Sequence, residues 1–189
     1  MDGDVAAQKA SLRGELLRRL TTQSPQECRR RSALIAERVI GSAAFSRAQV
    51  LLGYSALAHE VDTDAILDAA LAQGKRVALP CVVPQTRALV AYAIRDRARD
   101  LEPGPYGVLQ PRQQTAARVP LETIDLVLVP GVGFDTAGRR LGHGLGYYDR
   151  LLPQLPQDTP RIGLAFACQL VEQIPVTADD VPVHTVVSA

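Results

Sequence analysis

The sequence has little that would bind nucleic acid. None of its 189 residues is tryptophan, and aromatic residues make up 4% of the chain, so few side chains can stack on unpaired bases. Lysine and arginine together number 21 and aspartate and glutamate 20, which leaves a formal net charge of +1. Because binding to a polyanion depends mainly on an excess of positive charge, the composition does not favour a nucleic-acid partner.

Cysteine is scarce, and long apolar runs are absent. The three cysteines, Cys28, Cys81 and Cys168, are widely spaced, which is typical of neither a disulfide framework nor a zinc site. The N-terminal segment MDGDVAAQKA begins with acidic residues and has no apolar core, so we expect no secretory signal. No run approaches the roughly 18 apolar residues of a membrane span. We therefore expect a cytoplasmic protein with inert thiols, and a monomer, although nothing in the sequence fixes the oligomeric state.

The hydrophobic fraction of 47% and the length fit one domain over residues 1–189. Apolar runs predict strands at 49–54, 76–79, 88–94, 124–129, 162–166 and 183–187. Helices are expected at 6–20, 24–40, 62–72, 146–152 and 169–173, with a surface excursion between 103 and 120. Wholly apolar strands that alternate with helices are typical of a parallel sheet covered on both faces. The sequence predicts a three-layer α/β domain with an open, mostly parallel central sheet.

The densest signal for chemistry is the glycine-rich segment at 138–150, GRRLGHGLGYYDR, which follows a buried strand and opens a helix. Alternate glycines at 142, 144 and 146 allow close approach to a ligand and can direct several N–H groups into one concavity. A helix N-terminus and the charges of Arg139 and Arg140 favour a phosphate chain there. The segment is neither a Walker A loop nor a G-x-G-x-x-G fingerprint. The alternative is a mobile connection whose glycines only make turns.

Several charged residues have two interpretations each. Asp149 either holds Mg²⁺ against bound phosphates or complements the dipole of the helix it begins. At about 100° per residue, Lys9 and Arg13 lie on the same helical stripe as Leu16 and Leu20, so they either reach a bound anion or lie at the rim with their charges in water. Glu60 follows a predicted strand, where an open α/β sheet forms its ligand crevice, but such an acid is also often only solvated.

Other polar residues give weaker signals. The acids Asp179 and Asp180 are typical of a turn. The histidines His59, His143 and His184 show neither metal-site nor triad spacing, so none is assigned as a base.

Taken together, these segments resemble the 5-formyltetrahydrofolate cyclo-ligase family over nearly the whole chain. The most specific likeness is PGVGFD at 130–135 leading to RLGHGLGYYD at 140–149. Further segments resemble family motifs: Lys9-x-x-Leu12-Arg13, Gly53-Tyr54 through Glu60-Val61-Asp62-Thr63, Tyr106-Gly107-Val108 through Pro111, and Gly163-Leu164-Ala165-Phe166 with Gln169, Pro175 and Asp180. Gln110 replaces the acid usual in the third motif, and His184 lies where an acid is common.

The resemblance implies an ATP- and Mg²⁺-dependent ligase that forms a C–N bond. Its reaction converts 5-formyltetrahydrofolate to 5,10-methenyltetrahydrofolate, with release of ADP and phosphate. In the family, the formyl oxygen receives the phosphoryl group, N10 attacks the formyl carbon, and phosphate leaves. Such phosphoryl transfer depends more on positioning and charge neutralisation than on an acid–base pair.

The family's functional residues can be carried over to matching positions of this sequence. Arg140 and Tyr147 would be catalytic, and Arg13, Ser55, Glu60 and Tyr147 would bind the folate. Asp149 and Asp180 would bind the metal. The nucleotide would be bound by Lys9, Arg13, Arg140, Leu141, Gly142, His143, Gly144, Leu145, Gly146, Tyr147 and Tyr148.

Two other functions remain open at this point. One is a nucleotide- or folate-binding protein that kept the glycine-rich segment but lost turnover. The other is a sugar-phosphate isomerase on a related open α/β fold, which needs a carboxylate base and no ATP.

Overall fold

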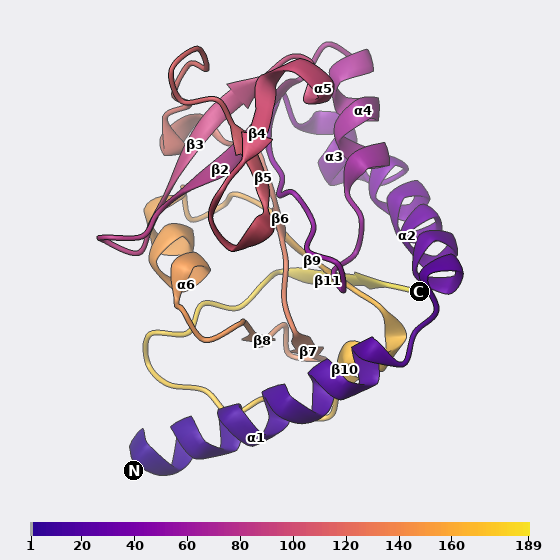
Figure 1. Cartoon of the computed structure of the whole chain (residues 1–189), viewed down its shortest axis with the longest axis vertical. Helices are drawn as coiled ribbons and strands as arrows, with labels where there is room; N and C mark the ends of the chain where they lie inside the picture. The colour runs from indigo at the N-terminus through magenta and orange to yellow at the C-terminus, as the bar shows by residue number, and fades with distance from the viewer. Residues whose placement is uncertain (1) are drawn as a thin grey trace.

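The central sheet of this computed structural model, which describes residues 2–189, has six strands in the order β11-β9-β6-β1-β2-β3 (Figure 1). Their bounds are β1 Val50–Leu52, β2 Arg76–Val83, β3 Ala88–Ile94, β6 Leu126–Val129, β9 Arg161–Ala165 and β11 Thr185–Ser188. All neighbouring strands are parallel except β2 and β3, which form an antiparallel hairpin. The predicted mostly parallel sheet is confirmed.

Helices cover both faces of the sheet. They are α1 Asp2–Thr21, α2 Pro25–Ile40, α3 Ala43–Arg47, α4 Asp64–Ala72, α5 Arg97–Asp100 and α6 Tyr147–Leu151. In Figure 1, α2, α3 and α4 lie together on one side, and α6 lies on the opposite side. Of the helices described, none is long and apolar enough to cross a membrane.

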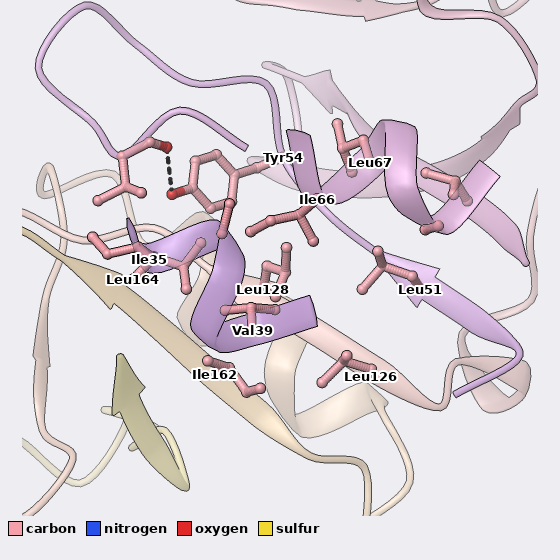
Figure 2. Packing of buried hydrophobic residues seen from close by; sticks show 14 of the residues in the cluster. Ile35, Val39, Leu51, Tyr54, Ile66, Leu67, Leu126, Leu128, Ile162 and Leu164 are labelled. Atoms are coloured by element: carbon pink, nitrogen blue, oxygen red, sulfur yellow. Dashed lines mark hydrogen bonds between the residues drawn. The ribbon is translucent and has the colours of Figure 1, made fainter. Parts of the chain in front are cut away.

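Alternation of side chains along the strands divides the core into two layers. In β6, Leu126 and Leu128 belong to one buried cluster, and Val127 and Val129 belong to the other, because successive residues of a strand point to opposite faces. Figure 2 shows the first cluster, in which Ile35 of α2 packs near Leu128 and Leu164. Because both faces of β6 are buried, its sequence is a continuous run of apolar residues.

The N-terminus of α2 follows its sequence signals. The Ser24 hydroxyl accepts a hydrogen bond from the Glu27 backbone N–H at 3.1 Å, and Pro25 begins the helix. This cap and proline are the predicted features.

Helix α1 begins at Asp2 rather than at residue 6, and β1 covers only Val50–Leu52 of the predicted strand at 49–54. Two further predictions were wrong. Strand β2 does not end before Pro80 but continues to Val83. Its pairing with β1 ends at Ala78, so the missing N–H of Pro80 removes no hydrogen bond from that pairing. The region 103–120 is not only a surface excursion, because β4 Leu101–Pro103 pairs with β5 Leu109–Pro111.

A second, three-stranded sheet was not predicted. It contains β10 Leu170–Val171, β7 Gly133–Asp135 and β8 Arg140–Leu141, and it lies between α1 and the rest of the molecule in Figure 1. The short helix expected at 169–173 is wrong, since residues 167–169 form a 3₁₀ turn and β10 follows. The parallel pairing of Leu170 with Phe134 explains the extended backbone there.

The ring of Phe134 joins the small sheet to the central sheet. It is fully buried, and it lies where a Cβ atom on either of two glycines would collide with it. A Cβ at Gly163 of β9 would be 2.5 Å from Phe134 Cε1, and a Cβ at Gly131 would be 2.7 Å from Phe134 Cζ. Glycine at these positions therefore makes room for the ring.

We predict that Gly163→Ala destabilises the protein by about 1–3 kcal/mol, the usual cost of overpacking a filled core. In a Phe134→Leu background, which lacks the colliding ring atoms, the same substitution should cost less. Chemical denaturation of the four proteins in this double-mutant cycle measures both values.

Gly14→Ala is the matched control, because a Cβ there would meet nothing closer than 3.7 Å. It lies inside α1 and should stabilise the protein by up to about 1 kcal/mol. An equal cost of Gly163→Ala in both backgrounds would contradict the proposed fit of the ring.

Candidate active site

A cavity of about 280 Å³ opens beside the segment that follows β1. Most of its wall is apolar, as is usual for small-molecule sites. Its lining comes from four parts of the chain: Tyr54, Ser55, Leu57 and Glu60 after β1; Pro80, Val82 and Leu89 of the β2–β3 hairpin; Tyr106 and Val108; and Pro130 with Arg140, Gly142, His143 and residues 145–149. The glycine-rich segment and Glu60, predicted separately from the sequence, therefore share one cavity.

The glycine-rich segment is only partly a loop. Arg140 and Leu141 form the buried strand β8, which corrects the expectation that the whole segment connects a strand to a helix. Gly144 and Gly146 have φ angles of 96° and 70°, a region that favours glycine. Gly146 caps α6, so the predicted helix start is confirmed.

Arg140 lies in the wall of the cavity and is 7% exposed. Its Nη2 donates to Asp149 Oδ1 at 2.7 Å, and its guanidinium lies 5.5 Å from the centre of the Tyr148 ring. Arg139 instead pairs with Asp135 at 3.6 Å and does not line the cavity.

Two buried donors in this wall lack partners. Arg140 Nε and the Tyr148 hydroxyl make no hydrogen bond within residues 2–189. Burial raises the pKa of Tyr148, which keeps its hydroxyl protonated and able to donate. An unpaired buried donor costs about 1–3 kcal/mol, so these atoms fit a ligand rich in acceptors, such as a phosphate chain.

Two tyrosines stand at the mouth of the cavity. The hydroxyls of Tyr106 and Tyr147 lie 3.2 Å apart, and their rings meet edge to face with centres 6.3 Å apart. Partial burial and the contact with Tyr106 raise the pKa of Tyr147. In the sequence Tyr106 stood out only as part of a family motif. Its left-handed backbone, with a φ of 62°, could not be predicted from the residue type.

Helix α1 reaches the site through its two predicted cations. Arg13 Nε donates to the Gly142 carbonyl at 2.8 Å, and Lys9 Nζ lies 2.5 Å from Asp180 Oδ2. Leu16 and Leu20 are buried on the same stripe. Both cations therefore have partners in the protein, at positions far away in the sequence.

Asp180 is held by the turn in which it lies as well as by Lys9. Its Oδ2 accepts hydrogen bonds from the backbone N–H and the hydroxyl of Thr177. Partial burial acts to raise the pKa of Asp180, but the bonds from Lys9 and Thr177 outweigh it and hold the pKa below its usual value.

The two carboxylates predicted to bind Mg²⁺ each pair with a cation. No group of three or more His, Cys, Asp or Glu side chains that could hold a metal occurs among the described residues. Asp149 accepts its hydrogen bond through Oδ1 and Asp180 through Oδ2, so within residues 2–189 the second oxygen of each carboxylate makes no hydrogen bond. Mg²⁺ commonly binds one or two carboxylates together with substrate phosphates and water. Asp149 lines the cavity and Asp180 does not, so each carboxylate could contribute a single oxygen, and the metal role of both stays a prediction.

Glu60 has one oxygen bound to the backbone and the other facing the glycine-rich segment. Its Oε2 accepts from the Leu57 N–H at 2.9 Å, and its Oε1 lies 3.2 Å from His143 Nε2. Ser55 is half-buried in the cavity wall. Ser55, Leu57 and Glu60 also border a second cavity of about 640 Å³.

Two buried polar residues that position the site were not singled out as such from the sequence. The Asp135 carboxylate accepts from the backbone N–H groups of Ala137, Arg139 and Ile174, which fixes the turn between β7 and β8. The Gln169 amide donates to the Gly131 and Val132 carbonyls and accepts from Phe166 N–H. Both residues lie in segments that resemble family motifs, and this resemblance was the only indication of their importance in the sequence.

Comparison with known proteins gives one consistent family. Residues 5–189 match the 5-formyltetrahydrofolate cyclo-ligase family. The probable 5-formyltetrahydrofolate cyclo-ligase of Caenorhabditis elegans is 32% identical over 188 residues, which cover 95% of this chain and 91% of the relative. The 5-formyltetrahydrofolate cyclo-ligase of Mus musculus is 31% identical over 190 residues, 96% of this chain and 94% of the relative.

Solved structures agree with these sequence relatives. The 5,10-methenyltetrahydrofolate synthetase of Aquifex aeolicus superposes with a TM-score of 0.82 at 30% identity, over 95% of this chain and 89% of that chain. A synthetase of the same name from Mycoplasma pneumoniae shares the fold, with a TM-score of 0.76 at 23% identity, over 95% and 97% of the two chains. Because the family match and the relatives span nearly its whole length, the chain belongs to the 5-formyltetrahydrofolate cyclo-ligase family.

Proposed function

We propose that this protein converts 5-formyltetrahydrofolate to 5,10-methenyltetrahydrofolate with ATP and Mg²⁺, releasing ADP and phosphate. The names of its relatives support the reaction. The observation that carries it in this chain is the pair of buried, unpartnered donors, Arg140 Nε and the Tyr148 hydroxyl. They lie where the glycine-rich segment forms a wall of the apolar cavity.

The apolar cavity suits the flat rings of the folate. Glu60 is a carboxylate that can accept N–H groups of a heterocycle, and Ser55 lies beside it in the wall. Tyr147 at the mouth can pack against a ring system that enters there. Arg13 reaches the glycine-rich segment, so in this proposal it lies between the two substrates.

The ATP phosphates would lie along residues 140–148, with the charges of Lys9, Arg13 and Arg140 around them. Leu141, Gly142, His143, Gly144, Leu145 and Tyr148 complete this proposed surface. Mg²⁺, held by Asp149 and Asp180 with the phosphates, would supply neutralisation of the phosphate charge. These groups position the reactants and balance charge, which is what phosphoryl transfer requires.

The proposed chemistry has two bond-forming steps. The formyl oxygen takes the terminal phosphoryl group of ATP, and the bond to ADP breaks. N10 then attacks the formyl carbon, the carbon–oxygen bond breaks, and phosphate leaves with that oxygen as N10 loses its proton. Arg140 and Tyr147 would stabilise charge and geometry at the formyl group.

A coupled assay tests the proposal directly. Methenyl absorbance and ADP should both rise when 5-formyltetrahydrofolate and Mg-ATP are present, and neither should rise when one substrate is left out. Binding of both ligands without product would instead indicate a non-catalytic relative. Turnover of a sugar phosphate without ATP would indicate an isomerase.

We predict that Arg140→Lys lowers kcat/KM for ATP about ten- to a hundredfold, since losing a charge-assisted contact is worth about 1.5–3 kcal/mol. Lysine keeps the charge but lacks the planar fork and the Nε donor. Arg139→Lys is the matched control, because Arg139 pairs with Asp135 outside the cavity. Steady-state kinetics with an unchanged ATP dependence in Arg140→Lys would remove Arg140 from the site.

Asp149→Asn should lower activity and raise the Mg²⁺ concentration needed for half-maximal rate. The substitution keeps the shape of the side chain but removes the charge that a metal would require. A Mg²⁺ titration of the rate, beside a thermal melt, checks this. A lower Tm with an unchanged Mg²⁺ requirement would show that Asp149 serves only Arg140 and the helix.

Lys9→Met should weaken ATP binding and reduce the rise in Tm that saturating Mg-ATP produces by mass action. Without nucleotide the Tm should fall only modestly, because Asp180 keeps its bonds from Thr177. Melts of wild type and variant with and without Mg-ATP measure both effects. An equal ATP-induced shift in the two proteins would exclude Lys9 from the nucleotide site.

A further inference from the structure

One contact joins the two halves of the cavity. His143 lies in the glycine-rich segment, and Glu60 lies in the segment after β1, 83 positions earlier in the chain. Their side chains meet at 3.2 Å, from His143 Nε2 to Glu60 Oε1. Sequence reasoning assigned His143 to the nucleotide and Glu60 to the folate, so the contact crosses between the two proposed binding surfaces.

The side chains of Glu60 and His143 differ in their exposure to solvent. The Glu60 side chain is 9% exposed, whereas that of His143 is 42% exposed. Glu60 Oε2 is already engaged by the Leu57 N–H, so Oε1 is the oxygen left for a ligand. That oxygen is the one that faces the imidazole. A ligand that needs Glu60 therefore meets His143 first.

The segment that carries His143 is held by side chains alone. Residues 142–145 make no backbone–backbone hydrogen bond to the rest of the described chain. Arg13 holds the Gly142 carbonyl, and Arg150 Nη1 holds the Leu145 carbonyl at 3.1 Å. Glycines with positive φ at 144 and 146 give the backbone freedom to change conformation. His143 can therefore leave Glu60 without breaking a strand or helix.

We propose that His143 is a gate on Glu60: in the empty enzyme its imidazole takes the position of the folate N–H donors, and the folate must displace it. The proposal rests on the proposed function, since it assigns Glu60 to the folate. His143 then acts as a specificity-determining residue of the folate site, in addition to its place in the proposed phosphate-binding surface.

Two other titratable groups, Tyr54 and Tyr148, lie near Glu60. Burial raises the pKa of both, and the charge of Glu60 acts in the same direction. Both hydroxyls therefore stay protonated and neutral, and neither competes with the imidazole as a charged partner of Glu60.

The test measures 5-formyltetrahydrofolate binding to the full chain without ATP, so that no turnover occurs. His143→Ala should tighten the Kd about two- to tenfold, the factor expected when one hydrogen bond no longer has to be displaced. His143→Gln, which can still donate to Glu60, should restore a Kd near that of wild type.

His59→Ala is the matched control. His59 is an exposed histidine next to Glu60 in the sequence, and its side chain makes no hydrogen bond among residues 2–189. Its removal should leave the Kd as in wild type. An unchanged or weaker Kd in His143→Ala would overturn the gate and show that His143 is idle or supports Glu60. A wild type that binds no 5-formyltetrahydrofolate would instead count against the proposed function.

Discussion

The position of the glycine-rich segment depends on how the ring of Phe134 fits between two sheets. The ring occupies space that exists only because residues 131 and 163 are glycines. Through this contact β7 is fixed on the central sheet, and β8 follows from β7 by antiparallel pairing. Arg140, the first residue of β8, is thereby set in the cavity wall. The apolar fit of Phe134, together with the hydrogen bonds of Asp135 and Gln169, thus determines where the charge of Arg140 lies.

The charges of the site are balanced in pairs before any ligand arrives. Arg140 faces Asp149, and Lys9 faces Asp180. In the proposed reaction the cations belong to the phosphates and the carboxylates to Mg²⁺. Mg-ATP would therefore offer phosphate oxygens to the cations and Mg²⁺ to the carboxylates, so that each member of a pair would gain a partner of opposite charge. Such a site avoids the large cost of an isolated buried charge in the absence of nucleotide.

Much of the central fold could be predicted, because its signals are local or periodic. The strand at 88–94 has the predicted bounds, and the cap at Ser24 follows from residues within one helical turn. The small sheet could not be predicted, since strands of two or three residues are too short to show periodicity. Gln169 favours neither helix nor strand by itself, and its buried amide determines the turn only once the carbonyls of Gly131 and Val132 are near.

In the candidate site, too, local features could be predicted from the sequence and tertiary contacts could not. The clustering of glycines at 142–146 and the cations on the stripe of α1 were visible in the sequence. Their partners were not, because pairing of Lys9 with Asp180 or of His143 with Glu60 depends on tertiary structure rather than on spacing. The two neighbouring arginines also looked alike in the sequence, whereas in the structure Arg140 lines the cavity and Arg139, which precedes β8, pairs with Asp135.

Helix α1 contacts residues that lie far along the chain, and this separation has a consequence for synthesis of the protein in the cell. Lys9 is made well before its partner Asp180, which lies 171 positions later. At about 5–20 residues per second, this interval is on the order of ten to thirty seconds. Leu16 has no β7 to cover it until residues 133–135 are made, and Arg13 has no partner until Gly142 follows, 129 positions after it. Helix α1 therefore docks fully only after Asp180 has been made, and a nascent chain that lacks Asp180 leaves Lys9 without its carboxylate.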